Sequence, residues 1–308
     1  MAKQPSLPTT SRRKYFRREL PLHLILLPGV IMLLIFHYYP MYGVTIAFKN
    51  FNPGLGIGGS PWAGTKYFRT LFALPNIDRV FANTVTIAVL KILLNTSFSI
   101  IVALMLNECR HSAFRRTIQT VVYMPHFISW VILGTVFTSM LGSDGIVNRL
   151  IVSLGGKTQP FLSDNGLFRG VLLVTDCWKE VGYGTIVYLA AITGIDPTLY
   201  EAAVIDGAGR WRQTLHITLP GMMSIIALMA TLNLGKLLNA GFDQIFNMYN
   251  TLVYESADII DTLVYRLGIQ NAKYSLSAAV GLFKSGISCA LIGLSYYLSY
   301  RFAGYRVF

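Results

Sequence analysis

Long runs of apolar residues, separated by shorter polar segments, dominate the pattern of this chain. Six runs are long enough to cross a hydrocarbon core about 30 Å thick as helices, which takes roughly 20 residues each. They cover residues 22–48, 81–106, 117–141, 168–193, 219–238 and 279–300. No segment has the alternating pattern of membrane barrel strands, and helices satisfy their own backbone hydrogen bonds in lipid. The sequence therefore predicts an all-α membrane protein with six transmembrane helices.

Lysine and arginine are distributed unevenly among the polar segments, and this sets the predicted orientation. Residues 1–21, 107–116, 194–218 and 301–308 together hold thirteen of them, against eight in the three longer segments on the other side. Because cytoplasmic segments of membrane proteins carry the excess of Lys and Arg, we expect both termini in the cytoplasm. The chain then divides into a cytoplasmic tail (1–21), a transmembrane domain (22–300) and a second cytoplasmic tail (301–308).

The composition excludes several classes of function. Charged residues make up 13% of the 308 residues and hydrophobic residues 53%, whereas a soluble protein has about 25% charged residues. A water-soluble enzyme is therefore excluded. The net charge of +12 is concentrated in the cytoplasmic segments, so we expect contact with anionic membrane lipid and no nucleic-acid partner. Histidines and cysteines are scattered over separate segments, so neither a metal site nor a catalytic residue is predicted.

The cytoplasmic segment between the fourth and fifth runs reads GIDPTLYEAAVIDGAGRWRQTLHITLP, residues 194–220. Asp196 and Pro197 suit the N-cap and first position of a helix. Gly207 and Gly209 let the backbone reverse through conformations that are costly for other residues. The segment therefore predicts a helix-turn-helix.

This helix-turn-helix has two interpretations that the residues alone leave open. Adjacent Ala202 and Ala203 permit close approach of another surface, and Glu201 and Asp206 offer carboxylates that fix a register, which favours docking to another protein. Alternatively, the segment is a hairpin lying on the membrane surface, which Trp211 and other apolar residues would suit.

Residues 201–220, EAAVIDGAGRWRQTLHITLP, closely resemble the EAA motif of permease subunits in binding-protein-dependent ABC importers. The matching positions are Glu201, Ala202, Ala203, Asp206, Gly207, Ala208, Ile217, Leu219 and Pro220. Two positions depart, since Thr214 stands where the family usually has Phe and Ser224 where a Pro often follows. Residues 39–51, 123–132 and 141–151 also resemble carbohydrate-uptake permeases, most of all an oligosaccharide and polysaccharide branch that includes lipoprotein/polyuronate and alginate importers.

The resemblance implies a six-helix ABC importer permease in the bacterial cytoplasmic (inner) membrane. Its expected partners are a second homologous permease subunit, forming a heterodimer, two ATP-binding cassette ATPase subunits, an extracytoplasmic solute-binding protein and a saccharide substrate. The matching residues of the EAA loop would couple the chain to the ATPase. No GxxxxGK[ST] phosphate-binding loop occurs in the sequence, so ATP and Mg are expected in the ATPase subunits and no cofactor in this chain.

Polar and ionisable residues within the spans face a bundle interior or a cavity by default. The candidates for a substrate path are Asp176, Trp178, Lys179, Glu180, Tyr183, Asn233, Lys236 and Lys284. One interpretation is a saccharide path of hydrogen-bonding groups and aromatic rings. For Asp176, Lys179 and Glu180, which share a helical face, the alternative is an ion-pair network that orients helices. The excess of positive charge in the spans slightly favours an acidic saccharide such as alginate or another polyuronate.

An ion-coupled secondary transporter is a rival function of a different class, with Asp176 and Glu180 as its ion site. Such transporters usually have about twice this number of spans, or inverted repeats. This class also gives no reason for the EAA loop. An intramembrane enzyme is disfavoured because no catalytic constellation is present.

Overall fold

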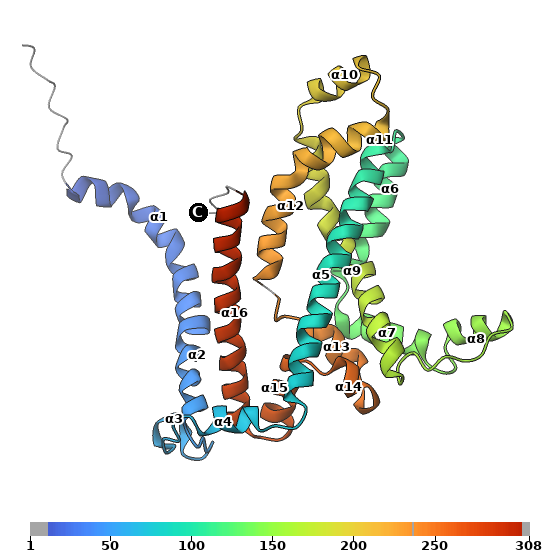
Figure 1. The fold of residues 1–308 in the computed structure, drawn as a ribbon. Helices are drawn as coiled ribbons and strands as arrows, with labels where there is room; N and C mark the ends of the chain where they lie inside the picture. The colour runs from blue at the N-terminus through green and yellow to red at the C-terminus, as the bar shows by residue number, and fades with distance from the viewer. Residues whose placement is uncertain (1–11, 236, 304–308) are drawn as a thin grey trace, which may run out of the picture.

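The protein is described by a computed structural model over residues 12–235 and 237–303. Within these residues it is helical, and the β structure is limited to an isolated bridge between Lys49 and Trp62. Long helices run side by side, with short helices gathered at one end and α10 and α11 at the other (Figure 1).

Each of the six predicted spans is helical. The first is one run of α1 (Arg12–Leu33), η1 (Leu34–Tyr38), α2 (Tyr39–Met41) and η2 (Tyr42–Phe48). The second is α5 (Ile77–Glu108), the fourth is α9 (Asn165–Thr193) and the sixth is α16 (Tyr274–Ala303). The fifth runs from α11 (Arg210–Gln213) through η4 (Thr214–Thr218) into α12 (Leu219–Leu234).

Five stretches of the described chain are long and apolar enough to cross a membrane. They are Glu19–Phe48, Ile77–Glu108, Trp130–Ser153, Arg210–Leu234 and Tyr274–Tyr297. Helix α9 completes the set with 29 residues, and it is less apolar because it carries Arg169, Asp176, Lys179 and Glu180. The all-α membrane architecture expected from the sequence is therefore present.

The third span is interrupted, whereas the sequence predicts one helix over 117–141. It consists of α6 (Ser112–Tyr123), a 3-10 turn η3 (Met124–Phe127) and α7 (Trp130–Leu141). Pro125 has no backbone N–H to continue the ladder, and the Ser129 side chain caps the new helix by accepting from the N–H of Ile132 at 3.4 Å. The interruption turns the His126 ring toward α9.

Several short helices occupy the end of the molecule opposite α10, in segments that the sequence predicts only as external loops. They are α3 (Gly56–Gly59), α4 (Lys66–Phe72), α13 (Phe242–Met248), η5 (Thr251–Val253), α14 (Tyr254–Ala257), α15 (Ile260–Tyr265) and η6 (Arg266–Gln270). The segment between α7 and α9 contains α8 (Ile146–Ser153), and the segment between α9 and α11 contains α10 (Pro197–Ile205).

The buried core lies where α5, α9 and the short helices meet. Ile87, Phe168 and Leu172 pack with Ile245 of α13, so α13 is part of the bundle and not a free loop. A second cluster joins α4, α5, α15 and α16, and a third joins α5, α9 and α12. These contacts hold the segment that follows α12 against the spans.

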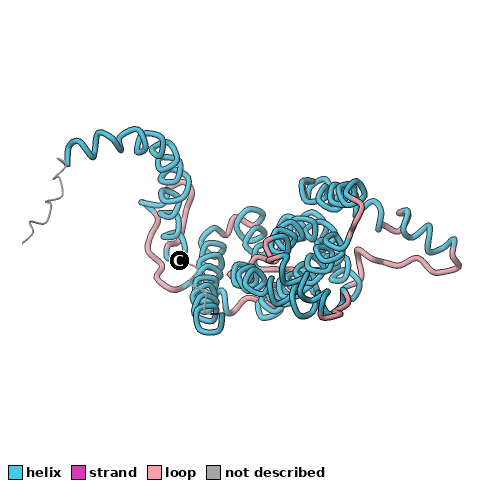
Figure 2. The backbone as a smooth tube through the Cα atoms, turned by 90° about the horizontal axis from the view of Figure 1, so that it is seen from above, coloured by secondary structure: helices cyan, strands magenta, loops and turns pink. Residues whose placement is uncertain are grey.

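The first span stands apart from the bundle formed by α5, α9 and α12 (Figures 1 and 2). Its end at η2 packs against α16, but Ile25, Leu26 and Phe36 are among many exposed apolar side chains along it. Helix α1 begins, and α16 ends, at the same end of the molecule as α10 (Figure 1). The two described ends of the chain and the EAA loop thus share one side.

Candidate functional site

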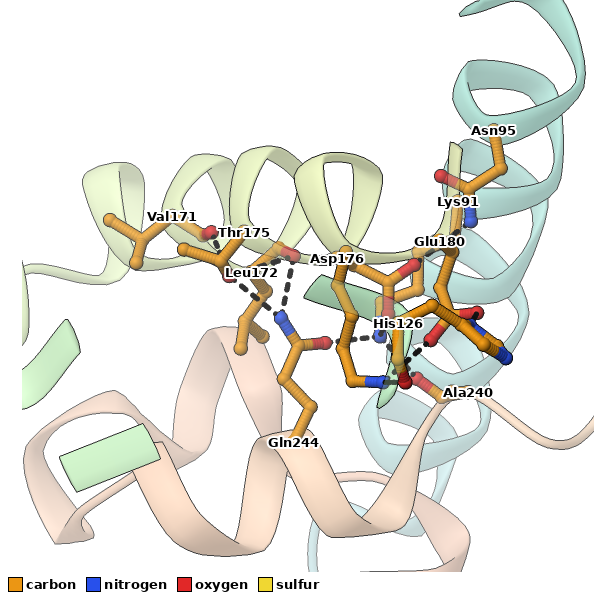
Figure 3. Close-up of polar contacts among 11 residues, drawn as sticks. Lys91, Asn95, His126, Val171, Leu172, Thr175, Asp176, Glu180, Ala240 and Gln244 are labelled. Atoms are coloured by element: carbon orange, nitrogen blue, oxygen red, sulfur yellow. Dashed lines mark hydrogen bonds and ion pairs between the residues drawn. The ribbon is translucent and has the colours of Figure 1, made fainter. Parts of the chain in front are cut away.

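A polar cavity of about 370 Å³ lies inside the bundle, between α5, α9, the start of α7 and the segment that leads into α13. Its polar and aromatic lining consists of Lys91, Asn95, Trp130, Asp176, Glu180, Asn233 and Asn239. Figure 3 shows the side chains of this region. Because the cavity is surrounded by membrane-spanning helices, its polar groups have a cost in lipid that internal partners must offset.

Lys91 and Asp176 form a buried ion pair at the centre of this network. The Nζ–Oδ1 distance is 2.9 Å, and the two side chains are only 8% and 10% exposed. Lys91 also donates to the Ala240 carbonyl at 3.0 Å and to the Gln244 side chain, while Asn95 donates to Asp176 Oδ2 at 3.0 Å. The pair is therefore neutral overall and fully surrounded by hydrogen bonds.

Gln244 links this ion pair to the backbone of α9. Its amide nitrogen donates to the Leu172 carbonyl and to Thr175 Oγ1, both at 2.8 Å (Figure 3). Gln244 is completely buried, and Gly241 beside it has a φ of +91°. A Cβ at Gly241 would lie 2.7 Å from Lys91 Nζ, so glycine allows the backbone to approach the lysine.

A second polar group lies one turn further along α9, where the interruption of the third span brings His126 against it. Glu180 is 2.9 Å from His126 Nδ1 and 3.3 Å from Lys179 Nζ, and Lys179 also donates to the His126 carbonyl at 2.7 Å. The His126 ring stacks on Tyr183 with centroids 4.7 Å apart, and Lys179 Nζ lies 5.7 Å from the Trp130 ring centroid. Asp176, Lys179 and Glu180 therefore all take part in ion pairs within the chain, as in the ion-pair network considered from the sequence.

The residues predicted to line the substrate path fall into three groups: those in or beside the cavity, those that pack against aromatic rings outside it, and two lysines. Asp176, Glu180 and Asn233 line the cavity, and Lys179 is buried beside it. Trp178 packs edge-on against Phe137 and Tyr183 stacks on His126; both are half-exposed and neither lines the cavity.

Two predicted cations remain. Lys284 lies in a separate cavity of about 710 Å³ beside α15 and α16, with its Nζ 2.5 Å from Asp261 Oδ1. Its charge is therefore balanced within the chain. Lys236 lies outside the described residues.

The residues of the site that sequence analysis did not include are Lys91, Asn95, Trp130, Asn239 and Gln244. Asn95 is four residues after Lys91, so helical spacing places both on one face of α5, and this was a usable signal. The Oδ1 atom of Asn95 is buried and has no hydrogen-bond partner among the described residues. Gln244 gives no local signal because its partners are 69 to 153 residues away along the chain.

The EAA loop forms a second candidate site at the other end of the chain's long helices. Asp196 caps α10 by accepting from the N–H of Thr198 at 2.9 Å, and this backbone hydrogen bond lowers the pKa of the Asp196 carboxyl. Gly207 has a φ of +73°, and the Ala208 N–H closes the turn on the Ala203 carbonyl at 2.8 Å. The helix-turn-helix expected at 194–220 is present.

The exposed face of this loop is apolar at several positions. Val204 is 64% exposed, Ile205 86% and Trp211 73%, and no residue of α10 is buried. Glu201 and Asp206 are also exposed. Arg210 ties the loop to the end of α5 through Glu108, with a 2.9 Å Nη1–Oε2 distance. The loop therefore presents a fixed, partly apolar surface that protrudes from the bundle (Figure 1).

No metal site stands out in the part of the chain that the structure describes, since no three His, Cys, Asp or Glu side chains are grouped there. Cys109, Cys177 and Cys289 are free thiols.

Comparison with known proteins gives consistent matches. Residues 95–303 match the family described as binding-protein-dependent transport system inner membrane component. The chain is 44% identical to Protein LplB of Bacillus subtilis (strain 168) over 93% of this chain and 90% of that protein. It is 42% identical to the polygalacturonan/rhamnogalacturonan transport system permease protein YteP of the same organism, over 91% of this chain and 88% of that protein.

A solved structure matches over almost the whole chain. It is the crystal structure of a bacterial ABC transporter involved in the import of the acidic polysaccharide alginate. The match has a TM-score of 0.87 at 38% identity, covering 94% of this chain and 98% of that chain. A second crystal structure, of a bacterial alginate ABC transporter in complex with alginate pentasaccharide-bound periplasmic protein, matches with a TM-score of 0.86 at 37% identity, covering 94% of this chain and 96% of that chain.

Proposed function

The chain belongs to the family of inner membrane components of binding-protein-dependent transport systems and is the permease of a carbohydrate ABC importer, and we propose that its α5–α9 cavity is the place where the saccharide passes. The observation that carries this proposal is a partly open polar cavity between membrane-spanning helices, with the side chains of Asn95, Glu180, Asn233 and Asn239 in its wall. A stacking surface, Trp130, lies in the same wall.

The chemistry of the cavity favours hydrogen bonding over strong charge attraction. Asp176 is neutralised by Lys91, and Glu180 lies between Lys179 and His126. Sugar hydroxyls can then exchange hydrogen bonds with the side-chain amides of Asn233 and Asn239 without meeting a large net charge. Such a path holds a saccharide weakly enough to release it.

An acidic oligosaccharide is the proposed substrate class. Support comes from the named substrates of two similar proteins, polygalacturonan/rhamnogalacturonan for the 42%-identical permease and alginate for the 38%-identical transporter. Lys284 contributes no unpaired charge to this selectivity, because Asp261 balances it. Lys236 stays a candidate from the sequence alone.

The proposed assembly contains a second homologous permease subunit, two ATPase subunits and an extracytoplasmic solute-binding protein. The exposed apolar side chains of the first span leave room for the second permease, and the protruding EAA loop offers a surface to an ATPase. ATP and Mg would bind and react in the ATPase subunits, and this chain would act without a catalytic site of its own. The coupling residues are Glu201, Ala202, Ala203, Asp206, Gly207, Ala208, Leu219 and Pro220.

In the proposed orientation the EAA loop and both termini are cytoplasmic. The excess of Lys and Arg in those segments and their shared end of the molecule support it. The short helices α3, α4, α13, α14 and α15 then lie at the external end. An ion-coupled mechanism is disfavoured, since the Asp176 carboxylate, its proposed ion ligand, is already bound by Lys91 and Asn95.

Two tryptophans of the same region provide a matched test of the cavity. In the complete transporter reconstituted in proteoliposomes, Trp130→Ala should reduce uptake of an oligogalacturonide several-fold, while Trp178→Ala, outside the cavity, should leave uptake close to the parent rate. Asn95→Ala should behave like Trp130→Ala. Each variant is first checked for normal assembly with its partner subunits. Equal effects of Trp130→Ala and Trp178→Ala, or unchanged uptake with Asn95→Ala, would contradict the proposed path.

A further inference from the structure

Helix α8 projects from the bundle as part of an arm formed by residues 142–160, and we propose that this arm lies in the lipid interface of the outer leaflet (Figure 1). The proposal rests on the bundle being embedded in a membrane, with the orientation proposed above. It does not depend on which saccharide is carried or on the cavity residues.

Side-chain hydrogen bonds and one close backbone contact fix the shape of the arm. Asn148 is 1% exposed, and its amide nitrogen donates to the carbonyls of Gly142 at 2.9 Å and Gln159 at 3.0 Å. Its Oδ1 accepts from the N–H of Gln159 at 2.8 Å. At the turn, a Cβ on Gly145 would lie 2.2 Å from the Met140 carbonyl oxygen, so only glycine fits. The direction of α8 relative to α7 is therefore fixed.

One face of α8 is apolar and uncovered. Ile146, Leu150 and Leu154 are four residues apart, so they share a face, and they are 66%, 60% and 80% exposed. At about 100° per residue, Val147 and Ile151 widen this face to an arc of about 140°. Asn148 lies on the other side, toward the returning segment. This is the pattern of a helix that lies flat in a membrane interface.

The position of the arm identifies lipid as the occupant. Helix α8 runs across the direction of α5, α9 and α16 beside the external end of α7, and α3, α4 and α14 extend further in that direction (Figure 1). Both views show the arm pointing away from the bundle, on the side opposite α1 and α16 (Figures 1 and 2). The arm thus leaves the bundle beside the external end of α7 and is directed away from the first span.

The surface of α7 continues into the apolar face of α8. Val131, Ile132 and Val136 are exposed aliphatic side chains of α7, which forms the external part of the third span, so acyl chains can reach them. Beyond the turn, the arm carries the exposed cations Arg149 and Lys157, whose long stems can place their charges among lipid phosphates. The arm thus combines an apolar face beside a membrane-spanning helix with cations that can extend to lipid phosphates. This is the composition expected at the boundary between acyl chains and headgroups.

Spin labels on the two faces of α8 test this proposal. The complete transporter is reconstituted in nanodiscs of phosphatidylethanolamine and phosphatidylglycerol, with its three cysteines replaced by serine and a single cysteine introduced by Leu150→Cys or Val152→Cys. Both original side chains are aliphatic and exposed, but they lie on opposite faces of the helix. We expect the label at 150 to collide several-fold more with oxygen than with a water-soluble nickel reagent, and the label at 152 to show the reverse.

Two outcomes would overturn the proposal. If both labels are equally accessible to nickel, the arm lies in water. If the label at 150 is shielded from both reagents and its shielding changes when the solute-binding protein is added, the face docks a protein. Should the cysteine-free chain not assemble, Leu150→Trp and Val152→Trp in the native background replace it, with quenching by brominated lipid measured against the parent. Quenching at 150 alone supports the proposal, and equal or absent quenching contradicts it.

Discussion

Lys91 and Asp176 show how a charged pair is tolerated inside a membrane protein. Both side chains are almost fully buried, and each has further hydrogen-bond partners from α5, the segment before α13, or α13 itself. Removing one partner leaves the other charge buried without compensation, which typically costs about 3–5 kcal/mol. Removing both together costs much less, because no isolated charge remains.

This difference gives a prediction for three variants. Lys91→Met should strongly lower the temperature at which the purified complex unfolds, and Lys91→Met/Asp176→Leu should recover much of that loss. Lys66→Met, at an exposed lysine, is the control and should have little effect. Thermal unfolding followed by size-exclusion chromatography measures all of them. If Lys91→Met unfolds at the parent temperature, the pair does not have the structural role assigned to it.

Sequence analysis succeeded at the residue scale where the signals are local. Asp196 as an N-cap and Gly207 at a reversing turn follow from short-range rules, and the structure has both features. Asp176, Lys179 and Glu180 share a helical face by spacing alone. The partners of Asp176 were not predictable, because Lys91 and Asn95 approach it from α5, a segment that only the folded chain brings next to α9.

At the scale of elements, glycines decide where helices approach closely. A Cβ at Gly182 of α9 would lie 2.2 Å from the Val122 carbonyl oxygen of α6, whereas a Cβ at Gly170 of the same helix meets nothing within 4 Å. Helix α6 leads into the interruption at η3, so this contact also positions His126 against α9.

Two glycine-to-alanine substitutions in α9 should therefore change the stability of the complex by different amounts or in opposite directions. Gly182→Ala should separate α6 from α9 and lower the yield and thermal stability of the complex. Gly170→Ala should be neutral or slightly stabilising, because alanine favours a helix over glycine by up to about 1 kcal/mol. Equal stability of the two variants would show that the α6–α9 crossing is looser than the structure indicates.

The EAA loop gives a second prediction at this scale. Gly207 has positive φ and open space around it, so a side chain there strains the backbone without a clash. Gly209 also has open space, but its φ of −66° suits any residue. Gly207→Val should abolish coupled uptake and binding-protein-stimulated ATPase activity while membrane insertion stays normal. Gly209→Val should retain much more of both activities, and full activity of Gly207→Val would argue against coupling through this turn.

The interruption of the third span marks a limit of pattern-based prediction. The apolar run continues through Pro125, so hydropathy alone gives no position for the break, and after the end of the run at residue 141 it gives no sign of a fixed turn into α8. The structure places both at backbone-specific residues, Pro125 and Gly145. The external helices were missed for another reason, since α13 is stabilised by burial against α5 and α9 and not by its own sequence pattern.

At the scale of the whole molecule, the two candidate sites lie at different depths of one bundle. The cavity lies between α5 and α9, and the EAA loop follows α9 directly and leads through α11 and η4 into α12. A movement imposed on α10 by a partner can therefore reach the cavity wall through the two helices that flank the loop. This arrangement offers a route by which ATP hydrolysis in the proposed ATPase subunits can drive the cavity helices.

ATP-driven uptake by the purified assembly is the most direct test of this account. The tagged chain is isolated from its native membrane, its companion subunits are identified by mass spectrometry, and the assembly is reconstituted in proteoliposomes with ATP inside and the solute-binding protein outside. We predict a second permease and ATPase subunits, and saccharide uptake that requires both ATP and the binding protein. Recovery of this chain alone, transporting saccharide on an ion gradient without ATP, would contradict the account.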